Sequence, residues 1–338
     1  MTLKNFDLEK YLEGAKRTYG QRQNVEKLAD ELTKKGFKNI VVLGIGGTWA
    51  EWYPVVEYCR HLSDFPIYLE NAGEFLVKQN LHYLSKDSLV LTSSATGNTK
   101  EILEACKLCI NKGINIYGFT KDETTPLAKL LTKAIYNPCG DCEDSYLLYF
   151  MLMLRLYKNL GYFPQYDRWA DQMKNLHANL VRIREEFEPR AVEIAEKYSK
   201  EPYTMLVGSG MLWGETYLFS MCILEEMQWK RTRPVKSADF FHGALELVEK
   251  DLPVFLIMGE DEYRPLDERV ERFAKRFTDK LEVFDTREFQ LTDIDDEFRV
   301  IATPMIITAI LTERLTAHYE LNTGHSLSFR RYYRQFEY

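Results

Sequence analysis

The sequence predicts an α/β protein with two similar halves, each a parallel sheet covered by helices. Short strands that are almost continuously apolar, such as residues 39–44 and 87–92, alternate with helical stretches of roughly 10–20 residues, as βαβ units require. Uniformly apolar strands suit a sheet that is buried on both faces. The order of strand, glycine-containing turn and helix starts twice, at residues 41–47 (VVLGIGG) and 205–210 (MLVGSG), which indicates an internal duplication.

The first half begins with helices and continues into strands. Residues 7–36 show apolar positions at three- and four-residue spacing, and Gly36 ends the pattern. The strands expected in this half lie within residues 39–44, 65–71, 87–94, 114–120 and 133–137. An apolar helix is expected at 146–160, followed by a long charged helical stretch at 167–200.

The second half repeats this order less clearly. Strands are expected near residues 204–208, 252–258 and 281–286, and residues 299–321 form either a strand leading into a helix or a helix throughout. The predicted division is an N-terminal helical segment (1–36), a first domain (37–165), linking helices (166–200), a second domain (201–320) and a C-terminal tail (321–338).

Length and charge limit the possible functions. The 338 residues suggest about two domains of ~150 residues each, and 45% of them are apolar. The net charge of −7 makes the chain a poor general binder of nucleic acid, because neutralising phosphates needs a positive field. The longest apolar run, residues 146–154, is far shorter than the ~20 residues that cross a bilayer. The N-terminus has no apolar signal region, so we expect a cytoplasmic protein without membrane attachment.

Two C-x-x-C pairs, Cys106/Cys109 and Cys139/Cys142, could hold zinc or form a redox dithiol. The first pair lies in the helical pattern EILEACKLCI, where thiols pack as small apolar groups. Four-cysteine zinc sites normally close on short turns rather than within a helix. The histidines form no pair at ligand spacing. We therefore expect no metal and no cofactor.

A hydroxyl-rich turn between a strand and a helix is the strongest local signal for a ligand. Hydroxyls crowd this turn, Gly97 lets the backbone approach an anion closely, and the following helix presents unpaired N–H groups. Ordinary helix capping needs one hydroxyl rather than four. The turn therefore predicts a phosphate site, and its candidate residues are Ser94, Thr96, Gly97, Asn98 and Thr99, with Ser93 as a fourth hydroxyl.

A second glycine-rich turn follows the first strand, at Gly44-Ile45-Gly46-Gly47-Thr48. It lacks the third glycine of a dinucleotide fingerprint and the G-K-[ST] of a P-loop. A tight turn over a small phosphorylated ligand fits it equally well.

Two adjacent carboxylates, Glu225 and Glu226, end the helix that follows Gly208-Ser209-Gly210, and His242 lies shortly afterwards. Neighbours on a helix point about 100° apart, so only one of the two carboxylates faces a given pocket. From the residues alone, surface carboxylates and a packed histidine are the more frequent explanation.

Taken together, these motifs resemble the sugar isomerase (SIS) domain family. The pattern Ser94-x-Thr96-Gly97-Asn98-Thr99-x-Glu101 resembles its phosphosugar loop, S-x-S-G-x-T-x-[DE]. Glu226 and His242 resemble the catalytic pair of the isomerase half of glucosamine-6-phosphate synthase. Gly46, Gly47 and Thr48 resemble its first substrate-binding turn, and Gly208, Ser209 and Gly210 the counterpart in the second repeat. The resemblance implies two tandem SIS domains, each a five-stranded parallel sheet in a three-layer sandwich.

Two departures from the synthase point to a more particular group. The chain has no glutaminase domain, and Ile223 stands where the synthase has a lysine one turn before the glutamate. The stretch from Glu225 to Gly243 and the R-R-Y-Y tail resemble the stand-alone fructosamine-6-phosphate deglycases. Those enzymes convert fructoselysine, glucoselysine or fructose-asparagine 6-phosphate to glucose 6-phosphate and the amino acid. The resemblance also implies a homodimer or higher oligomer, with the histidine contributed across the subunit interface.

Several alternatives remain open from the sequence. A phosphosugar aldose–ketose isomerase, or an isomerase of the glucosamine-6-phosphate deaminase type, would use the same residues, and a non-catalytic phosphosugar sensor is a further possibility. The basic group Lys230, Arg231, Arg233 and Lys236 could hold an amino-acid carboxylate or could be solvated surface. The acidic loop Asp141, Glu143, Asp144 and Ser145 could meet the sugar or cap the next helix.

Overall fold

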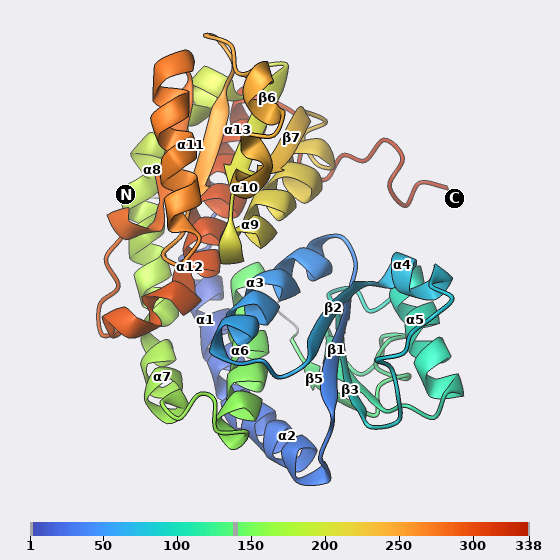
Figure 1. The fold of residues 1–338 in the computed structure, drawn as a ribbon. Coiled ribbons are helices and arrows are strands. Elements are labelled where there is room, and N and C mark those ends of the chain that lie inside the picture. Colours follow the sequence, from blue (N-terminus) through green and yellow to red (C-terminus); the bar gives the residue numbers. More distant parts are fainter. Residues whose placement is uncertain (1–2, 138–140, 337–338) are drawn as a thin grey trace. The chain divides into compact units, whose positions relative to one another are not determined.

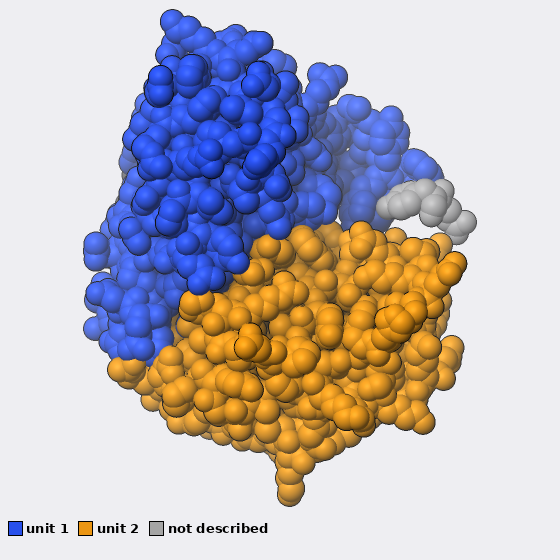
Figure 2. All heavy atoms as spheres, viewed as in Figure 1, with its two compact units in different colours: residues 1–8, 175–338 blue, residues 9–174 orange. Residues whose placement is uncertain are grey.

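The computed structural model describes residues 3–137 and 141–336, and the chain divides into two compact units (Figure 2). Unit 2 comprises residues 9–174, and unit 1 comprises residues 1–8 together with 175–338. Each unit contains one parallel sheet with helices packed on it (Figure 1). The predicted α/β class with two parallel sheets is confirmed.

Unit 2 has a five-stranded sheet in the order β2-β1-β3-β4-β5, with every neighbouring pair parallel. All five strands that the sequence predicts in this half are present. They are β1 (Asn39–Gly44), β2 (Ile67–Asn71), β3 (Ser88–Ser94), β4 (Ile116–Thr120) and β5 (Lys133–Tyr136). The two central strands β1 and β3 are buried along their whole length, as their continuous apolar sequences require.

The helices of unit 2 cover both faces of this sheet. They are α1 (Leu8–Gly20), α2 (Arg22–Lys35), α3 (Gly47–Leu62), α4 (Ala72–Val77), α5 (Lys100–Asn111), α6 (Cys142–Asn159) and α7 (Tyr166–Gln172), followed by the 3-10 turn Met173–Asn175. Cys106 and Cys109 lie on the buried face of α5 and pack in the apolar core. Cys139 of the second pair lies outside the described residues.

Unit 1 has a four-stranded parallel sheet in the order β7-β6-β8-β9. Its strands are β6 (Tyr203–Gly208), β7 (Arg231–Lys236), β8 (Val254–Met258) and β9 (Leu281–Asp285). The prediction of five strands was wrong by one for the described part of this unit. The edge strand β7 has the polar sequence RTRPVK, whose charges and proline are typical of an edge, and periodicity alone does not identify it.

The stretch 299–321, which the sequence leaves between strand and helix, is helical throughout. It belongs to one helical run, Asp296–Thr323, that is apolar and long enough to cross a membrane, but 83% of its apolar window is buried inside the fold. The run is therefore a core helix of unit 1, where it packs against α8 (Leu176–Tyr198).

The remaining elements of unit 1 are mostly short. Its helices are α8 (Leu176–Tyr198), α9 (Trp213–Tyr217), α10 (Ser237–Phe240), α11 (Arg264–Phe277), α12 (Arg299–Ile307) and α13 (Thr316–Thr323), with π-helices at Leu218–Glu225 and Thr308–Leu315. Single 3-10 turns lie at Gly210–Leu212, Ala244–Leu247, Thr286–Glu288 and Asp296–Phe298. π-Helical turns are rare, and those that do form are often found at functional sites. The first of the two in this unit ends directly before Glu226.

Candidate functional site

The hydroxyl-rich turn joins the end of β3 to the start of α5 in unit 2. The Ser94 hydroxyl accepts a hydrogen bond from the Gly97 backbone N–H at 3.0 Å and lies 3.1 Å from the Thr99 hydroxyl. The Thr96 hydroxyl donates to the Asn98 side-chain oxygen at 2.6 Å. Thr99 occupies the cap position of α5, yet its side chain makes no capping hydrogen bond. The start of the helix is therefore not closed by its own cap residue, and it can bind an anion.

Gly97 is required by the backbone of this turn. Its φ is +66°, a region that side chains other than glycine rarely adopt. A Cβ at this position would lie 2.4 Å from the Thr125 Cβ and 2.7 Å from the Thr120 hydroxyl. The Gly97 carbonyl also accepts the backbone N–H of Leu127 at 2.9 Å. The turn is thus fixed from two sides by the loop that follows β4.

The glycine-rich turn after β1 lies beside the hydroxyl-rich turn, because β1 and β3 are neighbouring parallel strands whose carboxyl ends share one edge of the sheet. Here the Thr48 hydroxyl donates to the Ile45 carbonyl at 3.0 Å, and Gly46 has a φ of +54°. A Cβ on Gly44 would lie 2.7 Å from the Trp49 Cα, so the start of α3 approaches the strand closely. The structure therefore brings together the two turns that the sequence predicts to bind phosphate.

A small cavity of about 20 Å³ lies beside the hydroxyl-rich turn. It has room for a single water molecule. The side-chain oxygen of Asn137 is buried and has no hydrogen-bond partner among the described residues, so such a water would satisfy it. The lining residues are Glu51, Ser94, Ala95, Phe119, Thr120, Asn137, Ser145, Leu148 and Tyr149.

Glu51 is a buried acid beside the hydroxyl-rich turn, and the sequence analysis missed it. It lies on α3, one turn after Thr48, in a helix that is otherwise largely apolar on its buried side. The Tyr149 hydroxyl donates to it at 3.4 Å, and the Tyr149 ring stacks on Trp52 with centroids 4.1 Å apart. Trp52 in turn donates its ring N–H to the Ser93 hydroxyl at 2.9 Å. The signal in the sequence was a single glutamate in an apolar helical stripe, three residues after the turn.

Because the Glu51 carboxyl is buried, we expect the stability of the folded chain to depend on pH. Burial raises the pKa of Glu51 from 4.5 to about 7, and hydrogen bonds from Cys142 and Tyr149 oppose this only in part. The folded chain holds this proton more tightly than the unfolded chain, so the stabilisation is fully present below pH 4.5 and is lost as the pH rises through 7. By linkage the loss approaches about 3 kcal/mol.

Between pH 5 and pH 8 we therefore expect the unfolding free energy of the parent chain to fall by about 2.5 kcal/mol more than that of Glu51→Gln. Urea unfolding of both proteins at the two pH values measures this difference. Other titrating groups, including the buried Asp267, are common to both chains and cancel in the comparison. Parallel pH dependences of the two chains would show that Glu51 does not titrate in this range.

The acidic residues before and at the start of α6, with Ser145, do not all lie at the candidate site. Glu143 is buried and accepts a hydrogen bond from the Tyr11 hydroxyl. Asp141 holds the cap position of α6 but makes no side-chain capping bond. Ser145 lines the small cavity beside the hydroxyl-rich turn. Of this group, Ser145 is the residue that the structure brings next to the candidate site.

The two adjacent glutamates of unit 1 point to different partners, as the helical geometry predicts. Glu225 accepts a hydrogen bond from the Thr232 hydroxyl at 2.6 Å. Glu226 accepts one from the side-chain Nε of Arg330 at 2.9 Å, and 26% of its side chain is exposed. Ile223, which stands where the synthase has a lysine, is buried. Glu226 is therefore the glutamate that remains partly accessible beside a cationic partner.

His242 lies on the exposed turn after α10, where its backbone N–H donates to the Asp239 carbonyl at 2.9 Å. Gly243, with a φ of +147°, follows it. No hydrogen bond or ion pair joins the side chains of His242 and Glu226 within the described part of unit 1. The pairing of these two residues therefore stays a prediction from the family resemblance.

The second-repeat turn, Gly208-Ser209-Gly210, already contains an anion of the protein itself. The Asp261 carboxylate accepts the backbone N–H of Met211 at 2.7 Å, and a Cβ on Gly210 would lie 2.2 Å from it. Nearby, Asp267 accepts a hydrogen bond from Ser237, and burial raises the pKa of Asp267 to about 7. An external phosphate at this turn would have to displace Asp261.

Lys230, one of the four cations that could hold a carboxylate, is engaged within the fold. The Lys230 ammonium donates to the carbonyls of Tyr198, Ser199 and Glu201 at 3.4, 2.9 and 2.6 Å, and burial lowers the pKa of Lys230. Lys230 therefore closes the C-terminal end of α8 and its donors are occupied.

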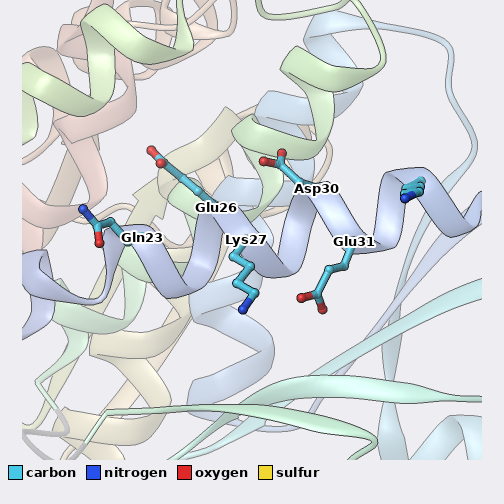
Figure 3. A pocket seen from close by; sticks show the side chains of 6 residues that line it. Gln23, Glu26, Lys27, Asp30 and Glu31 are labelled. Atoms are coloured by element: carbon cyan, nitrogen blue, oxygen red, sulfur yellow. The ribbon is translucent and has the colours of Figure 1, made fainter.

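A surface hollow along α2 does not compete as a site. The side chains that line it all come from this one helix, and they spread along its surface instead of converging (Figure 3). Its acids are already paired with cations of unit 2: Glu26 with Arg22, Asp30 with Arg155, and Glu31 with Lys133.

Comparison with known proteins agrees with this geometry. Residues 35–157 match the SIS domain family. The chain is 28% identical to the fructosamine deglycase of Bacillus subtilis over 324 residues, which is 94% of this chain and 97% of that protein. It is 26% identical to the fructoselysine 6-phosphate deglycase of Escherichia coli, with 78% of each chain covered.

Solved structures show the same fold over nearly the whole chain. A Bacillus subtilis structure described as a phosphosugar isomerase superposes with a TM-score of 0.88 at 26% identity, covering 96% of this chain and all of that one. The C-terminal domain of glucosamine-fructose-6-phosphate aminotransferase from Francisella tularensis gives 0.79 at 17% identity, covering 95% and 96%. Residues 35–157 therefore match the SIS domain family, the chain as a whole is similar to the fructosamine and fructoselysine 6-phosphate deglycases, and its fold is also that of the C-terminal domain of the aminotransferase.

Proposed function

We propose that this chain is a fructosamine-6-phosphate deglycase, which releases glucose 6-phosphate and a free amino acid from an amine-linked sugar phosphate. The observation that carries the proposal is the hydroxyl-rich turn at Ser94–Thr99, whose helix is left without a side-chain cap by Thr99. Neutral hydroxyls and backbone N–H groups suit a phosphate in an acidic chain. The similarity to deglycases over 94% of the chain supports the reaction class.

The reaction needs a proton moved between two neighbouring carbons. In this mechanism His242 assists ring opening by proton transfer at the ring oxygen. Glu226 removes a proton from C1 while the carbonyl oxygen on C2 takes up a proton, which gives an enaminol, and it then returns its proton to C2, which leaves the protonated imine of glucose 6-phosphate. Water adds to C1 of the imine, and the amine leaves. The substrate's own nitrogen supplies the imine, so the buried Ile223 is compatible with the chemistry.

The test is glucose 6-phosphate release from fructoselysine 6-phosphate, read with a coupled dehydrogenase. We expect release at an enzymatic rate, typically about 1–10³ s⁻¹. Fructose 6-phosphate and glucosamine 6-phosphate serve as matched substrates without the amino-acid adduct. Turnover of these two with none of the adduct would overturn the deglycase in favour of a plain phosphosugar isomerase. A cytoplasmic location, expected from the N-terminal sequence, and a homodimer, implied by the family resemblance, belong to the same proposal.

A further inference from the structure

Glu51 is a buried carboxylate without a cationic partner in the part of the chain that the structure describes. Its residue is 9% exposed, and its hydrogen-bond partners are the Cys142 thiol and the Tyr149 hydroxyl. Neither of these groups is a cation, and no lysine, arginine or histidine of the described residues pairs with Glu51. Buried charges in proteins are paired or bind metal ions. When Glu51 is ionised, the positive charge that its burial calls for must therefore come from outside the described side chains.

The cavity beside Glu51 contains a second group that is not satisfied. The side-chain oxygen of Asn137 has no hydrogen-bond partner among the described residues, and Asn137 is 9% exposed. Asn137 directly follows β5, whereas Glu51 lies on α3, so the fold brings the two residues to one cavity from separate elements. Two buried acceptors, one of them ionisable, thus border a single small space.

The other polar side chains of this cavity also carry oxygen. Ser94, Thr120 and Ser145 add hydroxyl groups, and the remaining lining residues are apolar or aromatic. Carboxylate, amide and hydroxyl oxygens are ligands for hard cations. The volume of about 20 Å³ admits one water molecule, and K⁺ has a radius close to that of water. One carboxylate balances one positive charge, and it would leave a divalent ion half neutralised.

We propose that Glu51 and Asn137 bind a monovalent cation of the size of K⁺ in this cavity. The sequence analysis expected no metal because it considered cysteine and histidine ligands, and these oxygen ligands are scattered along the chain. Ser94 also belongs to the hydroxyl-rich turn, so the cation places a positive charge beside the candidate phosphate site. A local positive charge favours an anionic ligand in a chain whose net charge is −7.

The test compares thermal unfolding of the parent chain in KCl and in choline chloride, both at about 150 mM so that screening is equal. Choline is too large for the cavity. At pH 8, where Glu51 is ionised, we expect KCl to raise the Tm by about 2–4 °C. This is the shift for a cation at roughly five times its Kd on a unit of this size. Burial raises the pKa of Glu51 to about 7, so at pH 5 a proton competes and weakens binding about a hundredfold. The two salts should then give the same Tm.

Two variants separate the charge from the site. Glu51→Gln removes the charge, and Asn137→Leu removes the neutral oxygen while Glu51 stays ionised. We expect both to lose the difference between KCl and choline chloride at pH 8. Glu57→Gln is the matched control, because Glu57 lies on the same helix but is paired with Arg60 at 3.5 Å and does not line the cavity. It should keep the full KCl shift.

Equal Tm values of the parent chain in the two salts at pH 8 would show that the cavity holds water, and would overturn the proposal. A KCl shift that persists in Glu51→Gln would overturn it as well, because the cation would then bind elsewhere. Unfolding in choline chloride shows whether each variant is folded, and Glu51→Gln, which keeps the size of the side chain, decides if Asn137→Leu does not fold. None of these measurements uses a sugar phosphate, so their outcome is independent of the deglycase assay.

Discussion

Glu226→Gln is expected to lower kcat/KM for glucose 6-phosphate release by about 10²–10⁴-fold, because the amide can neither accept nor return the proton between C1 and C2. The side chain keeps its size, and its ion pair with Arg330 is partly exposed. Loss of a pair of this kind changes the unfolding free energy by only about 0–1 kcal/mol. The coupled dehydrogenase assay measures the rate, and thermal unfolding measures the fold.

Glu225→Gln is the control for this experiment. The two glutamates are adjacent in sequence, but Glu225 accepts a hydrogen bond from Thr232, whereas Glu226 accepts one from Arg330. We expect its rate to stay close to that of the parent chain. Near-normal activity of Glu226→Gln, or an equal loss in both variants, would show that Glu226 does not transfer the proton.

Gly97→Ala is expected to disturb the hydroxyl-rich turn at residues 94–99 and to lower the unfolding free energy of the chain. The left-handed φ costs about 1–2 kcal/mol for alanine, and the new Cβ would lie 2.4 Å from the Thr125 Cβ, which adds about 1–3 kcal/mol of overpacking. Either Thr125 or the turn must shift to relieve this contact, and a shift of the turn moves the hydroxyls of Ser94 and Thr99, which are hydrogen-bonded within it. A displacement on the order of 1 Å at a positioning loop lowers kcat/KM by about 10²-fold. Steady-state kinetics and urea unfolding measure the two effects.

Gly113→Ala separates the loop effect from backbone strain. Gly113 also has a left-handed φ, +72°, but an added Cβ would meet only the flexible end of Lys86, at 3.2 Å. We expect a stability loss of about 1–2 kcal/mol with unchanged kinetics. If Gly97→Ala behaved in the same way, the turn at 94–99 would not hold the substrate.

Most of the fold could be predicted from apolar patterning, and the exceptions have physical causes. The buried strands β1, β3 and β8 are continuous apolar runs with turn residues at their ends, so their sequences identify them. The edge strand β7 faces solvent and carries charges, so it lacks that signal. The apolar stretch 299–321 is ambiguous by periodicity because it is buried all round, and only packing against α8 shows that it is a helix.

The site was predictable where its residues are close in sequence. The turn at 94–99 is local, and its hydroxyls and glycine could be recognised without the fold. The contact between Arg330 and Glu226 joins residues 104 positions apart, and the contact between Asp261 and Met211 joins residues 50 apart. Neither follows from composition or spacing. The role of Lys230 could not be predicted either, because its partners are three backbone carbonyls, which every type of residue has.

Because of the Asp261 carboxylate, the stability of the two units should depend differently on ligand concentration. In unit 1 the turn after β6 brings its own anion, so its helix start is satisfied as soon as the chain folds. In unit 2 we expect the hydroxyl-rich turn at residues 94–99 to take its anion from solution. A ligand that binds only the folded form adds a free energy of RT ln(1 + [L]/Kd). The cellular level of phosphorylated sugar would then set the stability of one half of the molecule and leave the other half unchanged.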